Sequence, residues 1–176
     1  KIGYFLPELL ETGKVLVGRD CRLSSPAIHD ALVEGILDAG ADVYDLGLTS
    51  TPMVYFATAN YGFDASVQIT ASHNPGNYNG MKVSRANALP VALDSGLGQI
   101  KEWMESGRPT PVAEKRGNVH EMEIMDDYLA FMEQFRGDWS NLKIAFDLSN
   151  GMSCLFARKV FGEGHDYLFD TIDGSF

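Results

Sequence analysis

Residues 14–47 read KVLVGRDCRLSSPAIHDALVEGILDAGADVYDLG, and this stretch decides the fold class. Its first five residues form a short, largely apolar run that ends in glycine, which is typical of a buried strand. The serines at positions 24–25 and the proline at 26 predict a helix start with a serine cap, and apolar residues then recur at helical spacing up to Gly40. Residues 41–47 return as a second strand. A strand, a helix and a strand in this order predict a βαβ unit with parallel strands.

The alternation of helices and strands continues downstream. Thr51 and Pro52 open a helix that we expect to end near Asn60. Residues 66–70 alternate between apolar and polar side chains and predict a strand that leads into a polar loop, and residues 81–84 leave this loop as the next strand. Further helices are predicted at about 94–106 and 124–135, with a proline-containing connector at 108–117.

The composition changes after residue 135. A turn-rich break at 136–141 is followed by a predicted strand at 142–147, a helix at 152–161 and a strand near 166–172. We therefore predict an α/β protein: a three-layer α/β/α sandwich with a mixed sheet in residues 1–137, and a truncated second α/β unit in residues 138–176. The second unit is too short to bury an adequate core alone.

The length and composition are those of a globular protein. The chain has 176 residues, of which 45% are hydrophobic and 22% charged. No apolar run approaches the roughly 18–20 residues of a membrane-spanning helix, and the N-terminus lacks the features of a signal peptide. Because the sequence starts at Lys1 rather than methionine, we expect further residues upstream.

Charge and cysteine content narrow the classes of partner. A formal net charge of −10 argues against non-specific binding to nucleic acid or to an anionic membrane. A phosphorylated ligand would need a locally positive pocket. Cys21 and Cys154 stand far apart without a metal or redox motif, so we expect no disulfide or zinc site and a reducing cytoplasm. The sequence does not indicate an oligomeric state.

Residues 70–82, TASHNPGNYNGMK, concentrate chemically active side chains in one loop. Ser72 directly follows a predicted strand, where a serine can be exposed as a nucleophile if a base removes its proton or if it already carries a phosphate. His73 is its neighbour, and Lys82 can neutralise a phosphate or transfer a proton. No GxSxG elbow surrounds Ser72. A purely structural turn remains an alternative on these residues alone.

Three stretches together resemble the alpha-D-phosphohexomutases, which include phosphomannomutases and phosphoglucomutases. These stretches are TASHNPxxYNGMK at 70–82, VGRDCRLSS at 17–25 and DLGLTSTP at 45–52, and their order and spacing are also similar. The resemblance covers about residues 15–135. It implies phosphoryl transfer between the 1- and 6-positions of a hexose phosphate through a phosphoserine and a bisphosphorylated sugar.

The resemblance also implies roles for individual residues. Ser72 would carry the phosphate, Lys82 would act as a general acid or base, and His73 would contact the reacting oxygens. Asn74, Arg19 and Arg22 would bind phosphate or substrate. Arg19, Asp20 and Arg22 follow the end of a predicted strand, where α/β proteins place their sites, and by the resemblance they would support the active site or form an ion pair that shapes it. Magnesium would be held by the phosphate on Ser72 and by three aspartates of a loop that this chain lacks. Two later acidic residues, Asp170 and Asp173, are interpreted as parts of a turn.

Several hypotheses follow for the function. The first is a phosphomannomutase or phosphoglucomutase with a hexose phosphate substrate, of which this chain is a fragment unable to turn over alone. A phosphoglucosamine mutase and a non-catalytic module that binds sugar phosphates or other anions are the alternatives. A hydrolase that uses Ser72 with His73 is a further rival class.

Overall fold

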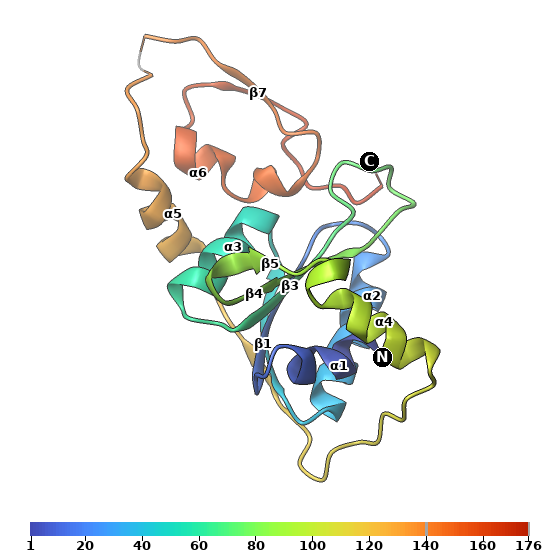
Figure 1. Cartoon of the computed structure of the whole chain (residues 1–176). Helices are drawn as coiled ribbons and strands as arrows, with labels where there is room; N and C mark the ends of the chain where they lie inside the picture. The colour runs from blue at the N-terminus through green and yellow to red at the C-terminus, as the bar shows by residue number, and fades with distance from the viewer. Residues whose placement is uncertain (140, 176) are drawn as a thin grey trace.

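The computed structural model describes residues 1–139 and 141–175, in which a six-stranded sheet carries helices on both faces and a two-stranded sheet follows (Figure 1). The α-helices are α1 Ile2–Leu9, α2 Ser25–Asp38, α3 Thr51–Asn60, α4 Leu97–Glu105, α5 Met125–Glu133 and α6 Ala157–Phe161. The strands are β1 Lys14–Arg19, β2 Asp42–Leu48, β3 Ala65–Ile69, β4 Met81–Arg85, β5 Leu89–Pro90, β6 Val119–Glu121, β7 Ala145–Asp147 and β8 Asp166–Leu168. Short 3-10 helices are η1 Ala86–Ala88, η2 Leu93–Ser95 and η3 Met152–Leu155.

The large sheet is mixed, with the strand order β5-β4-β3-β1-β2-β6. Strand β1 is parallel to β2 and to β3, and β6 is parallel to β2. Strand β4 returns antiparallel to β3, and β5 antiparallel to β4. The predicted βαβ unit and the mixed sheet are therefore confirmed. Because β1, β2 and β3 run in the same direction, the segments that follow their carboxyl ends meet at one edge of the sheet.

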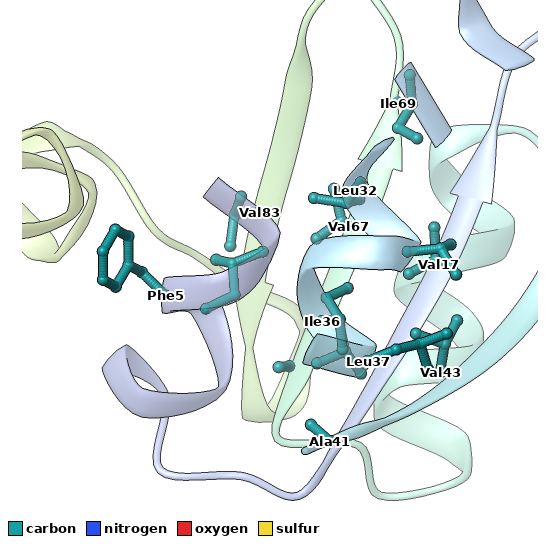
Figure 2. Packing of buried hydrophobic residues seen from close by; sticks show 14 of the residues in the cluster. Phe5, Val17, Leu32, Ile36, Leu37, Ala41, Val43, Val67, Ile69 and Val83 are labelled. Atoms are coloured by element: carbon teal, nitrogen blue, oxygen red, sulfur yellow. The ribbon is translucent and has the colours of Figure 1, made fainter. Parts of the chain in front are cut away.

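Two apolar layers enclose the sheet, as predicted for a three-layer sandwich. Val15 and Val17 belong to a buried cluster with residues of α1, α2 and α4, and Figure 2 shows part of this cluster. Leu16, between them, belongs to a second cluster with residues of α3 and α5. This division follows from the two-residue period of a strand, which points successive side chains to opposite faces.

The alternating polar residues of β3 are buried rather than exposed. Gln68 is fully buried, and its Nε2 donates to the backbone oxygen of Thr49 at 3.0 Å while its Oε1 accepts from Thr49 Oγ1 at 2.8 Å. Gly18, on the strand between them, leaves the room for this pair, since a Cβ there would lie 2.2 Å from Thr49 Oγ1. The pair fixes the turn between β2 and α3 to the middle of the sheet.

Some local predictions need correction. Helix α1 and strands β5 and β6 were not predicted: α1 is short and contains Pro7, and β6 is an exposed edge strand of three residues. The predicted helix at 94–106 is interrupted at Gly96, which has φ 148° between η2 and α4. Ser24 occupies the N-cap position of α2 but makes no capping hydrogen bond with its side chain.

The C-terminal segment forms the second, smaller sheet. Strands β7 and β8 pair in parallel, with η3 and α6 between them, which agrees with the predicted strand, helix and strand. Phe156 of this segment packs edge-on against Tyr128 of α5, with 5.6 Å between the ring centroids. Few of its side chains are buried, so these contacts with the first unit supply part of its core. The boundary at residue 137 stays a prediction.

The described part of the chain, residues 1–139 and 141–175, has no helix that is both long enough and apolar enough to cross a membrane.

His29 connects helix α2 to strand β2. Its Nε2 lies 3.0 Å from Asp45 Oδ2, at ion-pair distance but without hydrogen-bond geometry, and its Nδ1 lies 3.1 Å from Asp30 Oδ1. Contact with Asp45 raises the pKa of His29, although partial burial opposes this shift. Burial alone would raise the pKa of Asp45, but contacts with His29 and the N–H of Gly47 lower it overall.

Gly18→Ala should destabilise the fold. The added Cβ would come within 2.2 Å of Thr49 Oγ1 and 2.9 Å of Gln68 Oε1, so the buried amide pair must separate. Overpacking and the loss of these hydrogen bonds should lower the free energy of unfolding by about 2–3 kcal/mol, measured by urea denaturation. Gly13→Ala is the control, because a Cβ there meets no atom within 4 Å. Equal stability of the two variants would show that the contact between Thr49 and Gln68 does not require a glycine at position 18.

His29→Gln should flatten the pH dependence of stability. Because the pKa of His29 is raised in the folded state, its stabilising charge acts fully below the unfolded pKa of about 6.5 and is lost as pH rises through the folded pKa. The pKa of Asp45 is lowered in the folded state, so its charge stabilises the fold above an unfolded pKa of about 3.9. Asp45 therefore stays charged over the pH range in which His29 titrates.

Urea denaturation between about pH 6 and 8 should therefore show that the unmodified chain loses more stability than His29→Gln does. Asp45→Asn should reduce the same pH dependence, because it deletes the carboxylate that raises the pKa of His29 most, while Asp30 remains beside Nδ1. An unchanged slope in both variants would rule out the pair as its source.

Candidate active site

A cavity of about 690 Å³ lies where the parallel strands of the large sheet end. Its wall is formed by the turn after β1, the turn between β2 and α3, the loop after β3 and the turn after β7, together with Gln68 of β3 and Lys82 of β4. Ser72, His73 and Lys82 all line it, so the structure brings these predicted residues together. Asn74, Arg19 and Arg22 are not among the lining residues.

Ser72 occupies a strained and exposed position at the cavity. Its φ is 59°, in the left-handed region that costs a residue other than glycine roughly 1–3 kcal/mol. Its backbone N–H donates to Thr70 Oγ1 at 2.9 Å, which helps to hold the turn, while its side chain stays exposed. Ser72 Oγ lies 3.4 Å from Nδ1 of His73. The hydroxyl is thus presented to the cavity by backbone geometry and not by a buried network.

Arg22 organises the loop that carries Ser72. The residue is fully buried, and its Nε donates to Asp20 Oδ2 at 3.0 Å. Its NH1 and NH2 groups donate to four loop carbonyls at 2.8–3.0 Å, those of Ser72, Asn74, Pro75 and Tyr78. These contacts can use all five N–H donors of a guanidinium.

We expected Arg22 either to bind phosphate or substrate or to form an ion pair that shapes the site, and the structure shows the ion pair, with Asp20. A fully buried guanidinium whose donors already face backbone oxygens binds the loop, and it positions Ser72. Sequence alone could not separate the two roles, because both require an arginine after a strand end.

The first turn of α2 is tied to the same loop. Asp20 accepts hydrogen bonds from the backbone N–H of Arg22 at 3.1 Å and from Ser25 Oγ at 2.5 Å. Asn79 Nδ2 contacts the hydroxyl oxygens of Ser24 and Ser25, both at 2.9 Å. Residues 17–25 and the loop after β3 are therefore joined by a hydrogen-bond network.

The electrostatic balance of the cavity differs from that of the whole chain. The carboxylate of Asp20 also lines the cavity, but the guanidinium of Arg22 already compensates its charge. Lys82 is exposed, and among residues 1–139 and 141–175 it has no ion-pair or hydrogen-bond partner at its side chain. Cys21 is a further lining residue, and burial raises the pKa of its thiol, which favours its unreactive protonated form.

The remaining predicted residues lie near the cavity rather than in its wall. Arg19 is half-buried at the end of β1, and its carbonyl accepts from the backbone N–H of Thr49 at 2.9 Å. Asn74 is exposed and folds back on the loop, where its Nδ2 donates to the carbonyl of Ala71 at 2.8 Å. Their roles as phosphate or substrate ligands stay predictions.

Residues 49–52 line the cavity at the start of α3, whereas the sequence analysis used them only for the family resemblance and a helix start and assigned them no role in the site. The available signal was a run of hydroxyl side chains directly after the carboxyl end of a parallel strand, where α/β proteins place their ligands. Sequence reasoning missed Gln68, whose buried amide is visible in the sequence only as a polar residue in a strand.

The C-terminal segment closes one side of the cavity. Ser149, Gly151 and Met152 contribute to its wall, and Cys21 Sγ lies 3.9 Å from the carbonyl of Asn150. Gly174 packs against the backbone of Cys21 so closely that a Cβ there would lie 2.0 Å from its carbonyl oxygen. Figure 1 shows this end of the chain beside the green loop between β3 and β4.

The described residues do not form a magnesium site by themselves. Magnesium requires near-octahedral oxygen coordination, usually with one or two carboxylates. Among residues 1–139 and 141–175 no group of three or more histidine, cysteine, aspartate or glutamate side chains is arranged to hold a metal ion. Asp170 instead pairs with Arg158, a contact that was not predicted, and Asp173 accepts hydrogen bonds from Ser175 in the turn that follows it. A phosphate on Ser72 is the ligand that this chain could contribute.

Arg22→Lys should loosen the loop while it retains the positive charge. A lysine cannot reproduce the guanidinium fork, so several of the four loop carbonyls lose their donors around a buried charge, and the free energy of unfolding should fall by about 3 kcal/mol. Hydrogen exchange of the amides at residues 72–79 should accelerate more than exchange in the strands. Arg136→Lys is the matched control, because Arg136 makes an exposed pair with Glu133 at 3.3 Å. Loop exchange that is identical in both variants would contradict the positioning role.

Comparison with known proteins supports this architecture. Residues 1–109 match the family model described as phosphoglucomutase/phosphomannomutase, alpha/beta/alpha domain I. A phosphomannomutase of Klebsiella pneumoniae is 43% identical over 130 residues, which are 73% of this chain and 83% of that protein. A phosphomannomutase of Salmonella typhimurium is 36% identical over 187 aligned positions, which cover 100% of this chain and 41% of that protein.

A crystal structure of a phosphoglucomutase/phosphomannomutase family protein from Burkholderia thailandensis superposes with a TM-score of 0.80 at 30% identity, over 99% of this chain and 40% of that one. The chain thus spans about two fifths of the Salmonella and Burkholderia proteins. The fold and the sequence similarity agree, and the chain belongs to the phosphoglucomutase/phosphomannomutase family of phosphohexomutases.

Proposed function

We propose that this chain carries the phosphate-transferring serine of a hexose phosphate mutase, and that Ser72 is this serine. The observation that supports the proposal is the position of Ser72, exposed in a left-handed backbone conformation at a cavity that it shares with Lys82. Lys82 is the charged lining residue left without a charged partner in the described part of the chain.

The proposed reaction moves one phosphoryl group in each direction. A hydroxyl of the hexose phosphate attacks phosphorus, the bond between phosphorus and Ser72 Oγ breaks, and a bisphosphorylated sugar forms. After the sugar reorients, its other phosphate returns to Ser72 Oγ, which leaves the isomeric monophosphate. Such a transfer depends mainly on positioning and charge neutralisation.

The residues of this chain divide the work. The backbone around Ser72, fixed by Arg22, holds the phosphate carrier in place. Lys82 neutralises phosphate charge, and Lys82 or His73 takes the proton of the attacking hydroxyl and returns it. Magnesium, when bound, would further neutralise the phosphoryl oxygens, and among residues 1–139 and 141–175 the phosphate on Ser72 is the ligand that we propose for it.

The activity of the whole protein is a separate proposal. Because the chain spans 41% of the Salmonella relative, we propose that the residues that read the sugar lie outside this chain and that the isolated chain does not turn over. Mannose or glucose phosphate is the first choice of substrate, and glucosamine phosphate the alternative. Since Cys21 and Cys154 are both free thiols, we place the protein in a reducing cytoplasm.

A serine hydrolase is the competing reaction class, because Ser72 Oγ and His73 Nδ1 are 3.4 Å apart. A general base needs a group that orients it, and His73 has no contact with a carboxylate among the described residues. A fluorophosphonate that traps active serines should therefore leave Ser72 unlabelled. Labelling of Ser72 would favour the hydrolase.

Transplanting the chain into a relative should test the phosphate carrier. In a chimera that replaces the matching part of the Salmonella typhimurium phosphomannomutase, intact mass should show one phosphoryl group on Ser72 that leaves when hexose phosphate is added. Ser72→Ala should abolish both the phosphate and turnover, because it removes the hydroxyl oxygen that accepts the phosphoryl group.

Ser106→Ala is the matched control, since Ser106 lies at the end of α4 and donates to the carbonyl of Trp103. Circular dichroism verifies that each chimera is folded. A folded chimera that turns over with Ser72→Ala would disprove the role of Ser72.

A further inference from the structure

The N-terminus of helix α3 opens onto the candidate active site. Thr49, Ser50, Thr51 and Pro52 all line the cavity that contains Ser72 and Lys82. The helix has ten residues, and Ser50 is its N-cap. The proposed function assigns no role to these four residues.

Ser50 has a buried hydroxyl without a partner. The residue is 9% exposed, and its Oγ makes no hydrogen bond within residues 1–139 and 141–175. A serine at an N-cap usually bonds to a backbone N–H of its own helix, but the side chain of Ser50 does not. An unpaired buried hydroxyl costs free energy, which a ligand oxygen in the cavity could recover.

The backbone at the same position is also suited to an anion. The first N–H groups of a helix lack partners within the helix, and the aligned peptide dipoles place partial positive charge there. Pro52 has no N–H, and the N–H of Met53 is directed to the carbonyl of Ser50 at 3.1 Å. The N–H of Thr51 is therefore the available helix donor beside the hydroxyl of Ser50.

This turn is fixed by contacts outside the helix. Gln68 holds both the carbonyl and the hydroxyl of Thr49, and the carbonyl of Arg19 accepts from the N–H of Thr49 at 2.9 Å. Gln68 belongs to β3, the strand that leads to Ser72. Its hydrogen bonds to Thr49 therefore fix the position of the helix N-terminus relative to the Ser72 loop. The donors are thus preorganised, which is the condition for strong anion binding.

We infer that Ser50 Oγ and the N-terminal turn of α3 form a subsite for a phosphate monoester in the Ser72 cavity. The choice of phosphate rests on the proposed function, while the site itself rests on the unpaired hydroxyl and the helix end. The occupant is a phosphate group, supplied either by phosphorylated Ser72 or by a free ligand.

Titration of this chain with inorganic phosphate tests the free-ligand source. Amide signals of Ser50, Thr51 and Ser72 should shift in NMR spectra, and Ser50→Ala should weaken binding by about tenfold, because it removes a hydrogen bond to a charged group. Ser50→Thr keeps the hydroxyl and should bind within about threefold of the unmodified chain. Ser106→Ala should bind phosphate unchanged, because Ser106 does not line the cavity.

A chain with phosphoserine incorporated at position 72 during translation tests the other source. If the attached phosphate occupies the subsite, added phosphate should no longer shift the Thr51 amide. The second pKa of the phosphoserine, measured by phosphorus NMR, should then be higher in Ser50→Ala than in Ser50→Thr. A phosphoserine pKa that is equal in both, together with retained binding of added phosphate, assigns the subsite to the free ligand.

Thermal unfolding without phosphate separates this role from a structural one. Ser50→Ala should unfold at the same temperature as the unmodified chain or higher, because it removes an unpaired buried hydroxyl. A lower unfolding temperature that Ser50→Thr restores would overturn the subsite in favour of a structural serine.

The subsite would also be overturned if Ser50→Ala changed neither the affinity for added phosphate nor the second pKa of the phosphoserine. None of these measurements requires turnover, so the subsite and the transfer by Ser72 can fail independently.

Discussion

The buried guanidinium of Arg22 is the interaction on which the candidate site depends. It joins the turn after β1 to the loop after β3 through hydrogen bonds to Asp20 and to four loop carbonyls. A loop of polar residues with one proline and two glycines would otherwise have many accessible conformations, and ordering it costs entropy. One charged fork with fixed geometry orders several carbonyls at once, and the left-handed backbone of Ser72 persists because its surroundings determine it.

The lining of the cavity explains how an acidic chain could bind an anionic ligand. The net charge of −10 is spread over the surface, whereas the cavity is lined by hydroxyls, a helix N-terminus, Lys82 and one aspartate already paired with Arg22. Charges beyond a Debye length of about 10 Å are largely screened in solution, but groups within a cavity act at close range. Local arrangement, and not net charge, therefore decides which ligand can bind here.

Much of the fold could be predicted because its strongest signals are local. The run at 14–18, the helix that starts near Ser25 and the strands around the Ser72 loop were predicted from apolar periodicity and turn residues, and all were found. Helix α1 and strands β5 and β6 escaped prediction, because they are short and stabilised by neighbours. In α1, for example, Phe5 is fully buried in the cluster shared with α2 and α4.

For the site, the sequence by itself determined which chemical groups are available and that Ser72 follows a strand. Only the tertiary structure decided what these groups do. Arg22 and Ser72 lie 50 positions apart, and Thr49 and Gln68 lie 19 apart, yet both pairs are joined by hydrogen bonds. Such pairings depend on strand order and on burial, which no local pattern encodes. Strand order and burial likewise decided that Arg22 binds the loop from a buried position and that the hydroxyl of Ser50 has no partner among the described residues.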